Sequence, residues 1–70
     1  MPSVIPHIPI NEKLTLTVSE AAGLSGIPVR VVRSAIRRNE LRSCEAGEAT
    51  IRVRRTDLDS WVAALPERRR

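Results

Sequence analysis

The sequence predicts a small α+β domain with about three short helices and a two- or three-stranded antiparallel sheet. Three observations predict it. First, a helix-capping signal is followed by two apolar helical stretches that lie close together in the sequence. Second, two short strand-like segments come next, joined by a loop that contains glycine. Third, another helical stretch lies near the end of the sequence. With 70 residues, 41% of them hydrophobic, the chain is long enough for one domain with a modest core.

The first helix is predicted by its two ends. Residues 14–17 alternate apolar and polar side chains, which indicates a short strand. Thr17 and Glu20 then form a T-x-x-E capping box, in which each side chain can accept a hydrogen bond from the other residue's backbone N–H. Gly23 and Gly26 bracket the end of the helix, and we expect Gly26 to adopt a positive φ in a tight turn.

The second helix is expected to begin at about Pro28, because proline is tolerated in the first turn. Its predicted core-facing residues recur at helical spacing: Val29, Val32 and Ile36. A different arc of the same helix carries Arg30, Arg33, Ser34 and Arg37. Asn39 is expected to end the helix in a left-handed conformation.

Two short strands are predicted next, at residues 41–44 and 50–53, joined by a loop that contains Gly47. In the second strand, Ile51 and Val53 should point to one face and Arg52 and Arg54 to the other.

Thr56, followed by Asp59, is expected to cap the last helix, which ends at Pro66. Its predicted core stripe consists of Leu58, Trp61, Val62 and Leu65. We therefore expect three parts: an extended proline-rich arm (1–13), the folded domain (14–65) and a basic tail (66–70). The arm is either a disordered leader or an apolar strap that packs on its own body or on a neighbouring subunit.

Composition points to a basic, non-enzymatic binding protein. The formal net charge is +4, and Lys13 is the only lysine among the basic residues. Arginine can grip phosphate or guanine with two parallel hydrogen bonds, although a basic protein can also bind an acidic protein or an anionic membrane. Cys44 is the only cysteine, so neither an internal disulfide nor a zinc finger is expected. Ser34 has no base, and His7 has no partner on the arm, so we expect no catalysis, metal or cofactor.

The predicted order of elements is typical of a winged helix-turn-helix, in which the second helix lies in the major groove of DNA. The candidate DNA-binding residues are Arg30, Arg33, Ser34, Arg37 and Arg38 of the second helix, Arg52 and Arg54 of the hairpin or wing, and more weakly Thr17 and Ser19 at the start of the first helix. Two alternatives remain open. The helix arginines could form an ordinary solvated face, and the strand arginines could protect a sheet edge from aggregation.

Several motifs within residues 14–62 belong to one family pattern. They are Leu16-Thr17-Val18-Ser19-Glu20-Ala21-Ala22, Leu24, Gly26-Ile27, Val32-x-x-x-Ile36, Asn39-x-Leu41, Ile51-x-Val53 and Asp57-Leu58-x-x-Trp61. This stretch resembles the excisionase family of MerR-like winged-helix DNA-binding domains. The sequence departs from the family at Asn39, where glycine is usual, at Pro28, where serine is frequent, and at Val31, where a polar residue is common.

The resemblance implies that the second helix enters the major groove and that the wing contacts the adjacent minor groove or backbone. Small members of the family are phage excisionases, also called recombination directionality factors, which bind adjacent sites, bend DNA and direct an integrase toward excision. The expected partners are therefore double-stranded DNA, a phage integrase and further copies of the chain arranged head to tail, in the cytoplasm of a bacterial host. We expect no membrane association. The absence of a long dimerisation helix and an effector domain favours an excisionase over a MerR-type regulator.

Two other functions use the same surface. A small transcriptional regulator of its own operon would recognise one promoter operator instead of an array of sites. A protein–protein adaptor would bind an acidic partner with its basic face. RNA binding has no support, because the chain has no Phe or Tyr for base stacking.

Overall fold

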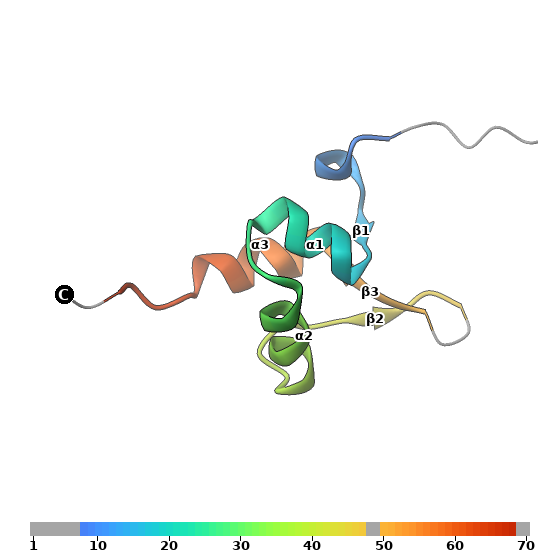
Figure 1. The fold of residues 1–70 in the computed structure, drawn as a ribbon. Helices are drawn as coiled ribbons and strands as arrows, with labels where there is room; N and C mark the ends of the chain where they lie inside the picture. The colour runs from blue at the N-terminus through green and yellow to red at the C-terminus, as the bar shows by residue number, and fades with distance from the viewer. Residues whose placement is uncertain (1–7, 48–49, 69–70) are drawn as a thin grey trace, which may run out of the picture.

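The computed structural model describes residues 8–47 and 50–68. In chain order its elements are a 3₁₀ turn η1 (Ile10–Glu12), β1 (Thr15–Leu16), α1 (Val18–Ser25), α2 (Val29–Arg37), β2 (Cys44–Glu45), β3 (Ile51–Arg54) and α3 (Arg55–Ala63) (Figure 1). The strands pair antiparallel in the order β1-β3-β2. This arrangement confirms the predicted α+β fold with three short helices and a three-stranded sheet.

The sequence predicted an extended arm, but the described part of the arm contains a short helical turn. Residues after Pro9 form η1, in which the Glu12 N–H donates to the Pro9 carbonyl at 2.9 Å and the Lys13 N–H to the Ile10 carbonyl at 3.2 Å. No proline follows Pro9 in this stretch, so both N–H groups are free to close a turn. Residues 1–7, with His7, lie outside the described residues.

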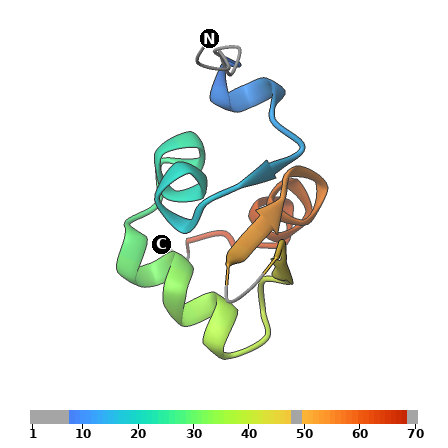
Figure 2. The same ribbon diagram turned by 90° about the vertical axis from the view of Figure 1, so that its right-hand side faces the viewer.

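Both ends of α1 follow the sequence prediction. The Glu20 N–H donates to the Thr17 hydroxyl and the Thr17 N–H donates to the Glu20 carboxylate, each at 3.0 Å, which completes the capping box. Gly26 has φ 74°, and its N–H donates to the Ala22 carbonyl at 2.9 Å. The chain then passes through Pro28 into α2, and Figure 2 shows α1 above α2 with the sheet beside them.

Asn39 ends α2 as predicted, with φ 61°. The turn allows the N–H groups of Glu40 and Leu41 to donate to the Ala35 carbonyl at 2.9 and 3.2 Å. Leu41 therefore folds back beneath the helix and is 1% exposed, so β2 begins only at Cys44 and not at residue 41. The second predicted strand is shifted by one residue, at Ile51–Arg54.

The core lies between the three helices and the sheet. Its buried residues are Leu16, Ala21, Ala22, Val32, Ala35, Leu41, Val53, Leu58 and Trp61. Val29 and Ile36 pack against this cluster but are only partly buried, whereas Val32 is fully buried. Ile51 is 51% exposed although it alternates in phase with Val53, because it lies further out on the β2–β3 hairpin.

Two predictions for α3 are wrong. The helix begins at Arg55, and Thr56 lies inside it without capping it, because the Arg55 N–H donates to the Leu14 carbonyl at 3.0 Å where β1 and β3 meet. The expected core stripe is also too long. Leu58 and Trp61 are buried, but Val62 and Leu65 are 40% and 42% exposed, because α3 extends beyond α1 and α2 (Figure 1).

Candidate nucleic-acid interface

The outer arc of α2 is a basic surface, opposite the buried Val32 and Ala35. Its four arginines are exposed, and Ser34 between them is half-buried; the arginines are Arg30, Arg33, Arg37 and Arg38. Among residues 8–47 and 50–68, no carboxylate lies within 4.0 Å of these four guanidinium groups. We call these four residues the α2 arginines. Their positive charge is open to solvent and to an anionic partner.

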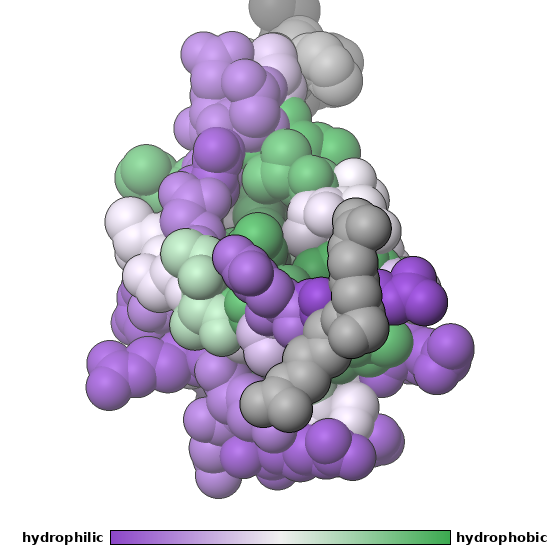
Figure 3. Space-filling view, turned by 90° about the vertical axis from the view of Figure 1, so that its left-hand side faces the viewer, coloured by the Kyte–Doolittle hydropathy of each residue, from purple (hydrophilic) through white to green (hydrophobic). Residues whose placement is uncertain are grey.

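The position of α2 suits contact with a large partner. It lies at the lower edge of the molecule in Figure 1, and the β2–β3 hairpin extends sideways from the same body. Hydrophilic residues also gather at that lower edge when the molecule is viewed from the end of α3 (Figure 3). Helix α1 packs against α2, and the side chains of the α2 arginines remain exposed.

The two hairpin arginines are placed differently from the α2 arginines. The Arg52 side chain is 32% exposed, and its Nη1 lies 3.8 Å from Glu20 Oε1. The Arg54 side chain is 56% exposed, with Nη1 3.7 Å from Asp57 Oδ2. The sequence predicts that both lie on the wing, but it does not predict that each has a carboxylate partner.

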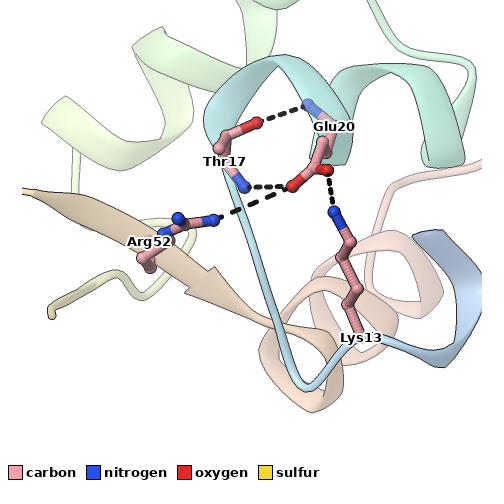
Figure 4. Close-up of polar contacts among 4 residues, drawn as sticks. All are labelled: Lys13, Thr17, Glu20 and Arg52. Carbon is pink, nitrogen blue, oxygen red and sulfur yellow. Dashed lines mark hydrogen bonds and ion pairs between the residues drawn. The ribbon is translucent and has the colours of Figure 1, made fainter. Parts of the chain in front are cut away.

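Glu20 joins three segments of the chain (Figure 4). Its Oε2 lies 2.6 Å from Lys13 Nζ, and its Oε1 accepts the Thr17 N–H and faces Arg52. The hydrogen bond from Lys13, followed by the one from the Thr17 backbone, lowers the pKa of the Glu20 carboxyl from its ordinary value. The Thr17 hydroxyl oxygen accepts the Glu20 N–H, so Thr17 serves the helix cap, whereas Ser19 beside it is exposed.

Arg42 is a candidate that the sequence pattern missed. It is exposed in the loop after α2, and no carboxylate of the described residues lies within 4.0 Å of its guanidinium group. It lines a polar groove with Asn39, Ser43 and Arg54. The sequence pattern had placed residue 42 inside a strand, and its side-chain charge was the only available signal of a binding role.

A second groove, of about 500 Å³, runs between α2 and α3. Its apolar lining comes from Val31, Ala35, Trp61 and Leu65, and its polar lining from Arg30, Ser34, Arg37, Arg38 and Glu40. We call it the α2–α3 groove. Among the described residues, no cluster of three or more His, Cys, Asp or Glu side chains could hold a metal ion. No helix formed by these residues is long and apolar enough to cross a membrane.

Comparison with known proteins agrees with this geometry. A family model described as a helix-turn-helix domain matches residues 15–66, which include α1, the turn at Gly26, α2, the hairpin and α3. No curated protein and no solved structure matches the chain. Proteins built on this domain bind DNA and are in general not enzymes. The match spans most of the chain, which therefore belongs to the helix-turn-helix domain family of DNA-binding proteins.

Proposed function

We propose that this protein is an excisionase: it binds and bends specific DNA and directs an integrase toward prophage excision. The observation that carries the proposal is the set of exposed α2 arginines, which have no carboxylate partner among the described residues and lie beside an arginine-bearing hairpin. The resemblance of residues 14–62 to the excisionase family favours this role over others within the helix-turn-helix family.

In the proposed complex α2 lies in the major groove. Arg33 and Arg37 are four residues apart, one turn of helix, so both can reach the edges of neighbouring bases and contact guanine in a bidentate manner. Arg30 and Ser34 lie on the same arc and complete this surface, while Arg38 at the helix end is placed for a backbone phosphate.

The hairpin contacts the adjacent minor groove or backbone through Arg52 and Arg54. Cations that neutralise phosphates on one side of the duplex, together with contacts in two successive grooves, favour DNA bent toward the protein. Bending of this kind brings separated integrase sites closer together, which is how a protein without catalytic residues can direct recombination.

Copies of the protein are proposed to bind head to tail along the DNA. The arm carries Ile8 and Ile10, which are 47% and 39% exposed, and the end of α3 offers Val62 and Leu65, 40% and 42% exposed, as an apolar counterpart. The arm leaves the body at the top of Figure 1, whereas α3 extends to the left, so each copy carries two unlike apolar surfaces. A contact between unlike surfaces builds an open array and not a closed pair.

The test of the function is a gel-shift series on duplexes from around the gene, including any integrase attachment site, at two salt concentrations. We expect a stepwise ladder on the attachment fragment, with mobility that depends on the position of the site because the DNA is bent. In a reconstituted reaction with the integrase, excision should require the protein. One discrete complex on a promoter fragment, without an effect on excision, would instead identify a transcriptional regulator.

The head-to-tail contact has its own matched variants. Ile10→Ser and Leu65→Ser should reduce cooperativity between adjacent sites much more than affinity for one site. Leu14→Ser is the control, because Leu14 is 86% exposed and takes no part in the proposed contact. Equal losses on one-site and two-site duplexes would contradict the proposed contact.

A further inference from the structure

The ion-pair cluster around Glu20 connects the wing to the base of the arm. Lys13 follows η1, Glu20 lies in the first turn of α1, and Arg52 is in β3 (Figure 4). Lys13 and Glu20 are close in sequence and Arg52 is distant, so the Glu20 carboxylate links the start of α1 to β3 and stands directly beside a proposed DNA-binding arginine.

The two cations are held unequally. Lys13 Nζ lies 2.6 Å from Oε2, whereas Arg52 Nη1 lies 3.8 Å from Oε1, an oxygen that already accepts the Thr17 N–H at 3.0 Å. The Arg52 side chain is 32% exposed and that of Glu20 20% exposed, so water reaches the pair and weakens it. Arg52 is therefore the partner that Glu20 can exchange most easily.

We propose that Glu20 and a DNA backbone phosphate compete for the guanidinium group of Arg52, and that Lys13 shifts this equilibrium toward the phosphate. The inference rests on the proposed contact of the wing with DNA. In the free protein, Glu20 holds Arg52 beside the first turn of α1 and acts as a positioning residue. On DNA, the guanidinium group turns to a phosphate, with which it can form two charge-assisted hydrogen bonds.

Lys13 makes the exchange favourable. When Arg52 leaves, Glu20 still has the Lys13 ammonium group and the Thr17 N–H as partners, so no carboxylate is left unpaired near the phosphates. Without Lys13, the departure of Arg52 would leave Glu20 without a counter-charge and close to DNA. Lys13 therefore supports DNA binding without itself contacting the nucleic acid.

The test uses full-length variants and fluorescence anisotropy with a short duplex that holds one site, at several salt concentrations. Glu20→Gln should tighten binding about two- to fivefold, the size of a partly exposed ion pair. Glutamine at this position can still complete the capping box, and circular dichroism checks that α1 is retained. Lys13→Gln should weaken binding by a similar factor, and Lys13→Arg should restore it.

The decisive measurement is the same pair of changes in an Arg52→Ala background, where both effects should disappear. Asp57→Asn is the matched control: it removes the same charge from the neighbouring pair with Arg54, and its effect should persist without Arg52. If Glu20→Gln tightens binding equally with and without Arg52, the change acts only through net charge and the exchange is overturned. If the wild-type protein binds no DNA specifically, the proposed function is wrong. If it binds DNA but the effects of Glu20→Gln and Lys13→Gln do not depend on Arg52, only the exchange is wrong, so the two failures are distinguishable.

Discussion

The α2 arginines and the arginines around the start of α3 differ in their electrostatic surroundings. Arg52, Arg54 and Arg55 have carboxylates within 3.8, 3.7 and 3.3 Å, supplied by Glu20, Asp57 and Asp59. Within the described parts of the chain, the α2 arginines have none at such distances. Both groups consist of arginines on one small domain, yet within residues 8–47 and 50–68 only the α2 arginines lack carboxylate partners.

This difference separates two ways of binding DNA. An unpaired arginine on α2 gives up only water and mobile counterions when it meets a phosphate or a base. An arginine of the wing must also give up its carboxylate, so its net contribution is smaller. We therefore expect α2 to provide most of the affinity and the base selectivity, and the wing to adjust them.

The largest effect is expected from Trp61→Ala, which removes a large side chain from the core on which both α2 and the hairpin pack. Trp61 is 8% exposed and belongs to the same core cluster as Val32 and Ala35 of α2. Truncation of a large core side chain costs about 3–5 kcal/mol, much of the total stability of a small domain. Thermal unfolding followed by circular dichroism should show a variant that is largely unfolded. A well-folded variant that has lost only DNA binding would place Trp61 in the interface instead of the core.

Next come Arg33→Ala and Arg37→Ala. An arginine that contacts a guanine through two hydrogen bonds contributes about 1–3 kcal/mol of discrimination. Each variant should therefore lose affinity for the cognate duplex and tolerate any base at one position, as measured on a panel of single-base substitutions. Arg55→Ala is the matched control, because Arg55 pairs with Asp59 and donates to the Asn11 carbonyl, away from α2. Equal losses in all three variants would remove the distinction between the two regions.

The local signals at both ends of α1 and at the end of α2 were reliable, because neighbours along the chain complete them. Thr17 and Glu20 cap each other three residues apart, and Gly26 and Asn39 adopt the positive φ values that their turns require. Helical spacing also placed the α2 arginines on an arc opposite Val32. The fold class and the outline of the candidate site could therefore be predicted.

Features that depend on distant residues could not be predicted in this way. The start of α3 is set by a hydrogen bond from Arg55 to Leu14, and the ion pair of Arg52 reaches back to Glu20. The helical periodicity predicts which face of α3 is apolar, but it does not predict how far along the helix the core extends. Leu65 was therefore wrongly expected to be buried. Pairing of charges is likewise a tertiary property, and it decides which arginines are open to DNA.

A smaller effect is expected from Arg54→Ala. The Arg54 side chain is 56% exposed, but it lies 3.7 Å from Asp57 in the free protein. Its removal should weaken binding to all sequences alike and reduce the slope of log Kobs against log salt by about one. The loss at a given salt concentration should be smaller than for Arg33→Ala, because the Asp57 pair no longer has to open. A salt titration on cognate and unrelated duplexes measures both quantities, and a sequence-dependent loss would show that the wing reads bases.

The smallest effect concerns pH and the stability of the free protein. Folding lowers the pKa of Glu20, chiefly through Lys13, so the folded state favours the charged carboxylate. The resulting stabilisation is fully present above the ordinary glutamate pKa, and it is lost as the pH falls through the lowered value in the folded protein. Unfolding by urea from neutral to strongly acidic pH should therefore show a stability difference between wild type and Glu20→Gln that narrows toward acid. A difference that is constant with pH would mean that Glu20 acts through its cap geometry and not through its charge.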